Sequence, residues 1–373
     1  MTEQEQQVLA GRRVAQVLAT STGGVGTHVR SVLAALGRAG AQVRVCGPAA
    51  TDALFGFAAL AAFRPVGISA GLDPVADLRA VRALARATAD VDLVHAHGLR
   101  AGLVAAAARR AGRATHPLVV TLHNELPPGG GLKRAVLSRA EAATVRAADV
   151  VLAASGDLAE NATRLGARDV RVAPVSAPPL PAPQRDRAQV RADLDLDGDR
   201  PLVVAVGRLH PQKGYDTLLD AARSWTDALV VVAGDGPLEQ PLQSRIDAEG
   251  LPVRLLGRRT DVADLLAAAD VCVLPSVWEA RSLTAQEALR SGTPLVATRV
   301  GGIPELVGDA AVLVPAGDAG ALADAVTAVL TDPPLRDRLT AAGPAQAARW
   351  PDEAGTARQL VALYRELLGP ADR

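Results

Sequence analysis

Two stretches of sequence decide the fold class: residues 202–214, which read LVVAVGRLHPQKG, and residues 14–26, which read VAQVLATSTGGVG. Each begins with a short apolar run and then turns at glycines, as a buried strand does where it leads into a helix. In open parallel sheets, ligands bind beyond the carboxyl ends of the strands. We therefore predict an α/β protein with two such domains that face each other across a cleft.

The same pattern extends outward from both stretches. Short runs rich in Val, Leu and Ala alternate with longer segments of helical period, such as residues 27–37 and 77–88. Continuous apolar strands separated by helices indicate parallel sheets that are covered on both faces. The predicted strands are residues 14–19, 43–46, 93–95, 118–122, 150–153 and 170–172 in the first half, and 202–206, 229–233, 253–256, 271–274, 295–297 and 312–314 in the second.

A change of composition separates the two halves. Residues 173–187, APVSAPPLPAPQRDR, are rich in proline, and residues 193–200, DLDLDGDR, are acidic, which is typical of a linker. We predict Rossmann-like domains over residues 1–175 and 201–350, joined by a linker over residues 176–200. Residues 351–373 form a separate C-terminal helix in this prediction.

Charge and composition narrow the class of protein. The 373 residues carry 40 Lys and Arg and 40 Asp and Glu, and this zero net charge argues against a polybasic nucleic-acid-binding protein. Residues 1–175 nevertheless hold 20 basic and 13 acidic residues, a net charge of +7, which leaves −7 for the rest of the chain. Either these opposite charges help the domains to associate, or the positive half meets an anionic acceptor or an acidic membrane face. Aromatic residues make up only 2% of the chain, which counts against binding platforms of stacked rings.

The cysteines and the N-terminal residues indicate the compartment. Cys46 and Cys272 lie in separate apolar runs, and neither has a second Cys or a His at metal-binding spacing. The first residues, MTEQEQQVLAGRR, are polar and differ from a signal peptide, and no apolar run approaches the roughly 20 residues of a membrane span. We expect a cytoplasmic protein, with peripheral contact at the inner membrane face left open.

In each predicted domain, the first strand is followed by groups that can bind phosphate. The turn with Gly23, Gly24 and Gly26 lets backbone amides and a helix N-terminus approach an anion, although the same pattern fits a purely structural turn. In the second domain, Arg208 and Lys213 follow the strand. Arg can hold a phosphate through two hydrogen bonds and Lys adds a point charge, so the pair is a candidate diphosphate site.

Two carboxylates follow the predicted strand 271–274. Glu279 lies in the turn after the strand, and Glu287 lies on a helix predicted to begin near Ser282 or Leu283 and to end at Arg290. Eight helical residues would separate the carboxylates by about 12 Å, whereas a retaining glycosidase needs a pair about 5–5.5 Å apart. The two glutamates are therefore interpreted as separate ligand contacts.

These motifs together resemble a known family. GGVG-x-H at residues 23–28, GRL-x-P-x-KG at residues 207–214, and two glutamates followed by GTPLVAT-x-VGGIPE at residues 292–305 are similar to glycosyltransferase family 4. The resemblance covers nearly the whole chain and is most specific over residues 208–305. It implies a GT-B fold, with an N-terminal acceptor domain and a C-terminal donor domain. It also implies hexosyl transfer from a nucleotide diphosphate sugar with retention at the anomeric carbon, and a last helix that crosses back to the first domain.

The resemblance assigns a role to each motif residue that matches. It implies that Arg208 and Lys213 hold the donor diphosphate, that Glu279 contacts the donor sugar and that Glu287 binds the ribose hydroxyls. His123 matches a histidine at the catalytic face and Gly24 matches the turn near the phosphate. Arg258 matches, more weakly, a position near the nucleobase. The family needs no metal and no cofactor besides the nucleotide sugar.

The chain departs from the family pattern after its first glutamate. Family members commonly have Gly-Phe-Gly there, and this chain has Ala280-Arg281-Ser282. Without glycine, a positive φ is harder to reach, and Arg281 either adds a third cation at the diphosphate or points to solvent. This departure supports one rival, a non-catalytic nucleotide-binding protein with the same fold. A second rival, a nicotinamide oxidoreductase, is disfavoured because the glycine turn lacks an acidic ribose partner.

Three further histidines are weaker candidates. His95 and His97 lie on one side of a strand, a spacing that can suit a metal, but no third ligand is evident and we assign no metal site. His28, on the first helix, is interpreted as a packed or capping residue.

Overall fold

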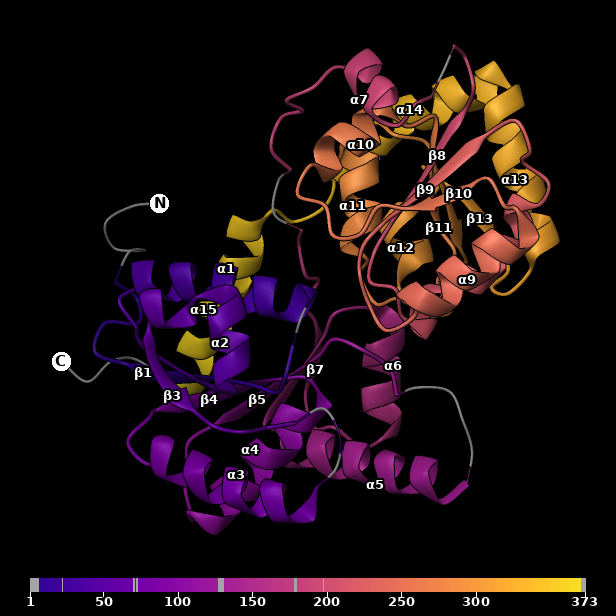
Figure 1. Ribbon diagram of the computed structural model, residues 1–373. Coiled ribbons are helices and arrows are strands. Elements are labelled where there is room, and N and C mark those ends of the chain that lie inside the picture. The colour runs from indigo at the N-terminus through magenta and orange to yellow at the C-terminus, as the bar shows by residue number, and fades with distance from the viewer. Residues whose placement is uncertain are drawn as a thin grey trace. The chain divides into compact units, whose positions relative to one another are not determined.

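The computed structural model describes residues 7–21, 23–69, 71, 73–126, 131–177, 180–196 and 198–369 (Figure 1). The chain folds as two compact units. The N-terminal unit comprises residues 1–176 together with residues 351–373, and the C-terminal unit comprises residues 177–350.

In the described part of the N-terminal unit, seven parallel strands form one sheet in the order β3-β2-β1-β4-β5-β6-β7. The order reverses between β1 and β4, and such a switch point is where ligands bind in open sheets. The strands are β1 (Arg13–Leu18), β2 (Gln42–Gly47), β3 (Ala62–Pro65), β4 (Leu93–His97), β5 (Leu118–Leu122), β6 (Val150–Ala153) and β7 (Val170–Val172).

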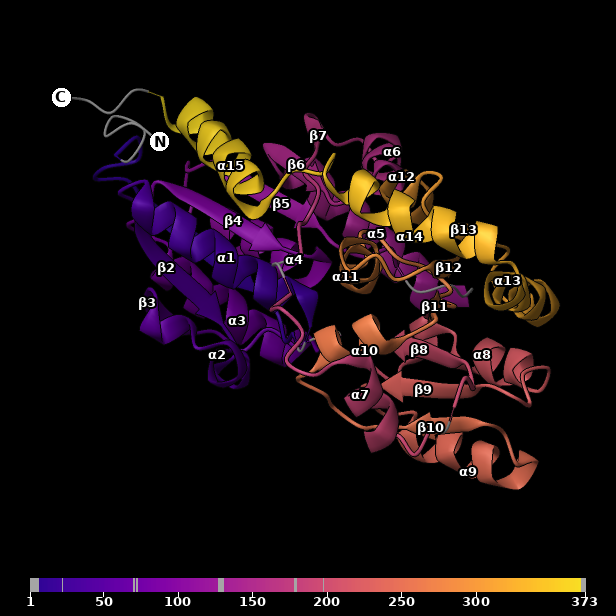
Figure 2. The same cartoon turned by 90° about the horizontal axis from the view of Figure 1, so that it is seen from above.

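Helices cover both faces of this sheet (Figure 1). The helices α3, α4 and α5 pack on one face, and α1 and α15 lie side by side on the other (Figure 2). The apolar residues Leu360 and Leu363 of α15 pack with Val14 of β1 and Leu93 of β4, so the end of the chain completes the core of the first unit. The helices are α1 (Gly24–Arg38), α2 (Ala49–Phe55), α3 (Pro74–Ala87), α4 (Leu99–Ala111), α5 (Gly131–Ala147), α6 (Gly156–Arg164) and α15 (Glu353–Leu368), with a 3-10 turn over Phe57–Ala59.

The C-terminal unit contains a six-stranded parallel sheet in the order β10-β9-β8-β11-β12-β13. Its strands are β8 (Leu202–Val206), β9 (Leu229–Ala233), β10 (Val253–Leu255), β11 (Val271–Leu274), β12 (Leu295–Thr298) and β13 (Val312–Val314). Its helices are α7 (Arg187–Asp193), α8 (Tyr215–Ala222), α9 (Glu239–Glu249), α10 (Val262–Ala268), α11 (Leu283–Arg290), α12 (Ile303–Val307), α13 (Ala319–Thr331) and α14 (Pro333–Ala347), with a 3-10 turn over Pro211–Lys213.

Alternate residues of each central strand in this sheet enter two separate cores. Val203 and Ala205 of β8 pack into one cluster with α8 and α13, whereas Leu202 and Val204 pack into the other with α10 and α11. Both faces of the sheet are therefore buried, which is why its strands read as unbroken apolar runs in the sequence.

Most predicted strands are confirmed, but two predictions differ from the structure. The predicted linker over residues 176–200 contains α7, which begins with a capping box formed by Asp186 and Gln189. Val190 and Leu194 pack into the C-terminal core, so the described part of this segment from residue 180 onward is structured. The strand β3 was not predicted: it is a short strand at the sheet edge, most of its residues are exposed, and its sequence, AFRP, includes Arg64 and Pro65.

The two units carry opposite net charges. The N-terminal unit, with its C-terminal helix, has 23 basic and 17 acidic residues, a net charge of +6, and the C-terminal unit has −6.

Burial raises the pKa of both Cys46 and Cys272 to about 12, as expected for thiols in the interior of a sheet. Among the described residues, no helix combines the length and apolar character that crossing a bilayer requires.

Candidate active site

The first loop of the C-terminal unit carries both predicted phosphate-binding cations. From the end of β8 the chain passes through Gly207 and Arg208 to the 3-10 turn Pro211–Lys213. The hydroxyl of Tyr215 donates a hydrogen bond of 2.9 Å to the carbonyl oxygen of Gly207 and so ties the loop to α8. Arg208 is exposed and Lys213 is half-buried, both at the carboxyl edge of a central strand.

A second loop, which follows β11, lies directly against the first. The amide of Val277 donates to the carbonyl of Gln212 at 2.8 Å, and the side chain of Gln212 donates to the carbonyl of Trp278 at 2.9 Å. Gly214 has φ +66°, and a Cβ there would lie 2.0 Å from the carbonyl oxygen of Pro275. Glycine at position 214 therefore permits both the turn and the close approach of the two loops.

This approach joins Lys213 to Glu279. The Lys213 ammonium lies 2.5 Å from Glu279 Oε1, and the Ser276 hydroxyl donates to the same oxygen at 2.8 Å. The backbone carbonyl of Glu279 accepts a hydrogen bond of 2.9 Å from the Gly302 amide. Gly301 has φ +48°, and a Cβ there would lie 2.0 Å from that carbonyl oxygen. A buried carboxylate is thus held beside a cation at the carboxyl end of the sheet.

Glu287 stands on α11, the helix that follows this loop. The Ser282 hydroxyl caps α11 by accepting a hydrogen bond of 3.3 Å from the Ala285 amide, and the helix ends at Arg290, which confirms the predicted bounds. Burial raises the pKa of Glu287 to about 7, against the opposing effects of Arg290 and Lys213. No hydrogen bond to this carboxylate is found among the described residues, so it is poorly solvated and able to accept hydrogen bonds from a ligand.

Arg258 is not brought together with these residues. It is exposed in the loop after β10, at the edge of the sheet, and two strands separate β10 from β11. Its neighbour Arg259 forms an ion pair of 2.5 Å with Asp261.

In the N-terminal unit, the glycine turn opens α1. Gly24 is the first residue of that helix, and the Gly23 position before it provides no side-chain cap. A Cβ on Gly26 would lie 2.3 Å from the ring of Phe55, so the third glycine of the motif is required for packing of α1. The first turn of α1 contains no acidic residue that would compensate the positive end of the helix dipole.

Four histidines gather beside this helix. His123 follows β5, His95 lies in the middle of β4, His97 ends that strand, and His28 belongs to α1. The His28 ring lies with its centroid 5.6 Å from that of His123 and 5.8 Å from that of His97. Burial lowers the pKa of His28 to about 4 and that of His95 to about 3, and it lowers those of His97 and His123 well below the usual value. The cluster is therefore neutral at pH 7.

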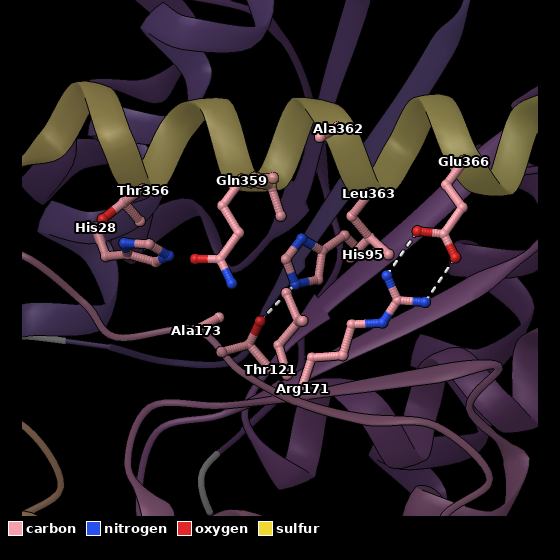
Figure 3. Close-up of a pocket in the computed structure, with 12 residues that line it drawn as sticks. His28, His95, Thr121, Arg171, Ala173, Thr356, Gln359, Ala362, Leu363 and Glu366 are labelled. Atoms are coloured by element: carbon pink, nitrogen blue, oxygen red, sulfur yellow. Dashed lines mark hydrogen bonds and ion pairs between the residues drawn. The ribbon is translucent and has the colours of Figure 1, made fainter. Parts of the chain in front are cut away.

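A cavity of about 240 Å³ adjoins the cluster beneath α15 (Figure 3). His28 and His95 line one side, and Gln359 reaches toward it from α15. At its far end Arg171 of β7 forms a paired contact with Glu366 at 2.6 and 2.7 Å, which ties α15 to the edge of the sheet. The cavity lies wholly within the N-terminal unit.

Within the described part of the chain, no group of three or more His, Cys, Asp or Glu side chains is arranged to hold a metal ion. Both ring nitrogens of His95 are instead hydrogen-bonded within the protein. Nδ1 lies 2.6 Å from the Tyr364 hydroxyl, and Nε2 lies 2.6 Å from the Thr121 hydroxyl.

Comparisons with known proteins identify the family of the chain. Residues 23–178 match the family model described as glycosyl transferase 4-like domain, and residues 186–346 match glycosyl transferases group 1. A D-inositol 3-phosphate glycosyltransferase of Corynebacterium urealyticum is 32% identical over 316 residues, which cover 76% of this chain and 74% of that protein. The chain belongs to glycosyltransferase family 4.

Two further relatives extend the comparison. An alpha-D-kanosaminyltransferase of Streptomyces kanamyceticus is 35% identical over 192 residues, 48% of this chain, and the match spans about half of that relative (49%). The structure of HepE from Anabaena in complex with UDP-glucose superposes with a TM-score of 0.80 at 23% identity, over 95% of this chain and 99% of that one. With its two parallel-sheet units, this family 4 chain has the GT-B fold.

The turn that departs from the family pattern contains no residue with positive φ. Among the described residues the non-glycine positions with positive φ are Arg113 and Asp195, so Ala280-Arg281-Ser282 needs no left-handed residue. The Arg281 guanidinium carbon lies 5.7 Å from the centre of the Trp350 ring, and its buried Nε and Nη2 have no hydrogen-bond partner within the described part of the chain. Burial lowers the pKa of Arg281 to about 10. Among the described residues, no hydrogen bond or ion pair joins Arg281 to Lys213 or Glu279, and its side chain packs near the indole ring of Trp350.

Gln16 and Tyr364, which contact the histidine cluster, were not predicted as functional residues. Gln16 is fully buried in the middle of β1, and Tyr364 is fully buried on α15. A polar residue inside the apolar run VAQVL was the available signal for Gln16, because a buried amide must find partners.

Proposed function

We propose that the protein is a retaining hexosyltransferase that moves a sugar from a nucleotide diphosphate sugar to a hydroxyl acceptor. The observation that carries the proposal is the Lys213–Glu279 pair at the carboxyl edge of the C-terminal sheet, with Glu287 close enough to Lys213 for its pKa to be affected. The names of the relatives support glycosyl transfer, and the neighbour HepE was solved with UDP-glucose. A UDP- or GDP-sugar is the proposed donor.

In this proposal, the catalytic work of the C-terminal unit is electrostatic. As the glycosidic bond breaks, negative charge grows on the β-phosphate of the leaving nucleoside diphosphate. Lys213 and Arg208 stabilise that charge, an effect usually large in enzymes. Glu279 orients the donor sugar, and the desolvated carboxylate of Glu287 accepts hydrogen bonds from the ribose hydroxyls.

The N-terminal unit contributes His123 at the catalytic face and the amides around Gly24 near the donor phosphate. A neutral imidazole exchanges hydrogen bonds with sugar hydroxyls without placing a positive charge beside the oxocarbenium-like sugar centre. Same-face attack guided by the leaving phosphate accounts for retention in this mechanism. The reaction uses no metal and no cofactor besides the nucleotide sugar.

We propose an anionic acceptor, phosphorylated or lipid-linked, such as a cell-envelope precursor, and a cytoplasmic site of action at the inner membrane face. The net charge of +6 on the N-terminal unit supports this choice, because it attracts anions and acidic lipid surfaces. Flotation with anionic and with neutral liposomes tests the membrane part. Salt-sensitive binding to the anionic vesicles alone is expected, and equal absence of binding to both would reject it.

A thermal-shift screen across UDP-, GDP- and ADP-sugars tests the donor. Stabilisation by one nucleotide series is expected, and slow hydrolysis of that sugar without acceptor would indicate an intact active site. NMR of the product with a suitable acceptor then determines the anomeric configuration. Binding of a nucleotide sugar without transfer or hydrolysis would instead favour a non-catalytic protein.

A further inference from the structure

A buried amide links the C-terminal helix to the histidine cluster. Gln16, in the central strand β1, donates a hydrogen bond of 2.9 Å from Nε2 to the hydroxyl oxygen of Tyr364. Its Oε1 lies 2.8 Å from Nε2 of His97. All three side chains are buried, so each of these polar groups depends on the others for its hydrogen bonds.

The amide gives this chain of hydrogen bonds a direction. Gln16 Oε1 has lone pairs and no proton, so His97 must donate from Nε2. Because burial keeps His97 neutral, its Nδ1 is then unprotonated and accepts. Nε2 of His123 lies 3.3 Å from this Nδ1 and is therefore the donor. A neutral His123 with its proton on Nε2 keeps an open lone pair on Nδ1.

Tyr364 is the origin of a second branch. Its hydroxyl oxygen accepts from Gln16. The one hydroxyl proton then needs an acceptor, and His95 Nδ1 lies within reach at 2.6 Å. His95 then donates from Nε2 to the Thr121 hydroxyl at 2.6 Å, a contact drawn in Figure 3. A reversed Gln16 amide would reverse every donor and acceptor in both branches. The orientation of one amide therefore sets the tautomers of three histidines.

We propose that Gln16 and Tyr364 are positioning residues that hold His123, through His97, as the Nε2-protonated tautomer, so that Nδ1 accepts a hydrogen bond from a substrate hydroxyl. The proposal rests on the proposed function, in which His123 faces the reacting sugar. It gives the C-terminal helix a role in the chemistry of the N-terminal unit besides packing. Neither Gln16 nor Tyr364 touches the substrate in this scheme.

The tautomers are measured by ¹⁵N NMR of the full-length protein labelled at histidine, with His123 assigned from its loss in His123→Asn. An unprotonated Nδ1 and a protonated Nε2 are expected for both His97 and His123. The opposite pattern, with His123 protonated on Nδ1, would overturn the proposal. This readout needs no enzymatic activity and no variant at Gln16 or Tyr364.

Two variants connect the tautomer to catalysis. Tyr364→Phe removes only the hydroxyl, and we expect mixed tautomers at His123 and a kcat lowered about tenfold with an unchanged KM for the donor. Thr356→Val removes a hydroxyl of the same helix that bonds to Ser176 and to the Pro174 carbonyl, outside this network, and serves as the matched control, with the His123 tautomer and kcat unchanged. A Tyr364→Phe protein that folds and keeps both the wild-type tautomer and the wild-type kcat would contradict the proposal. Gln16→Met provides a second test if Tyr364→Phe does not fold.

The two proposals fail in different ways. If the wild-type protein transfers no sugar but shows the expected tautomers, the proposed function fails and the positioning network stands. If transfer proceeds and the tautomers are reversed, only the network fails.

Discussion

The side-chain ammonium of Lys213 lies 2.5 Å from Oε1 of Glu279, so two groups separated by 66 positions in the sequence neutralise each other at one sheet edge. Their loops follow β8 and β11, which are neighbours in the sheet, and glycines at positions 214 and 301 let the backbones approach. An incoming diphosphate would compete with Glu279 for this cation, while the sugar would compete with Lys213 for the carboxylate.

Replacing the cations tests the diphosphate assignment. Lys213→Ala and Arg208→Ala should each lower kcat about 100- to 1,000-fold, because each removes charge stabilisation that develops with the leaving group. Circular dichroism and the melting temperature establish that the fold is intact. Arg223→Ala, at an exposed ion pair with Glu249 in the same unit, should leave kcat unchanged. An unchanged turnover in the Lys213 variant would reject the assignment.

The raised pKa of Glu287 predicts a pH-dependent affinity for nucleotide. Only the ionised carboxylate accepts two ribose hydrogen bonds strongly, so nucleoside diphosphate binding should tighten as pH rises through about 7. Calorimetry across this range measures the effect. Glu287→Gln corrects for titration of the nucleotide itself and should bind more weakly, with a flatter pH dependence. Equal affinity in Glu287→Ala and the wild type would remove Glu287 from the site.

The same group predicts how stability changes with pH. The folded pKa of Glu287, about 7, is above its ordinary value of 4.5, so the folded chain binds more protons than the unfolded chain between these values. The free energy of unfolding should therefore fall as pH rises through this window. Glu287→Gln should remove this fall, with a gain on the order of 1 kcal/mol above pH 7, discounted for partial exposure. The exposed Glu239→Gln should change nothing, and urea denaturation at several pH values compares the two.

Arg281 should contribute little to donor binding. Arg281→Leu removes a cation–π contact and also two buried N–H groups without partners, so the free energy of unfolding should change by less than about 1 kcal/mol. Nucleotide affinity should change by no more than about twofold. Loss of a charge-assisted hydrogen bond to the nucleotide would lower the affinity by more than that. Arg290→Leu, which loses a 2.6 Å hydrogen bond to the Ala177 carbonyl, should destabilise the protein by about 1–2 kcal/mol. A large loss of nucleotide affinity in Arg281→Leu would instead indicate that this guanidinium binds the diphosphate.

Gly301 should be essential for the position of Glu279. Gly301→Ala places a methyl group against the Glu279 carbonyl and should cost at least about 2 kcal/mol more than Gly317→Ala. Position 317 also has positive φ, +75°, but no atom lies within 4 Å of a Cβ there. Gly317→Ala therefore measures the cost of the backbone strain without a steric contact. Chemical denaturation measures the difference, and equal costs would show that the steric contact is easily relieved.

Much of the fold could be predicted from the sequence because the central strands are buried on both faces of each sheet. Strands covered on both faces must be apolar throughout, and the runs at 202–206 and 271–274 coincide with β8 and β11. The predicted bounds of α11 also agree with the structure, where the Ser282 side chain caps its first turn, a local interaction. The edge strand β3 and the helix α7 were missed, because both are short and most of their residues are exposed.

The sequence by itself determined the two parallel-sheet domains, the motif residues and the family, because these depend on residue type and spacing along the chain. Only the tertiary structure decided that Lys213 pairs with Glu279, that Arg281 packs on Trp350, and that Gln16 bonds to Tyr364 across 348 positions. Such contacts depend on strand order and on which face each helix buries. Local sequence patterns do not encode either property, since each arises from the packing of segments that are distant along the chain.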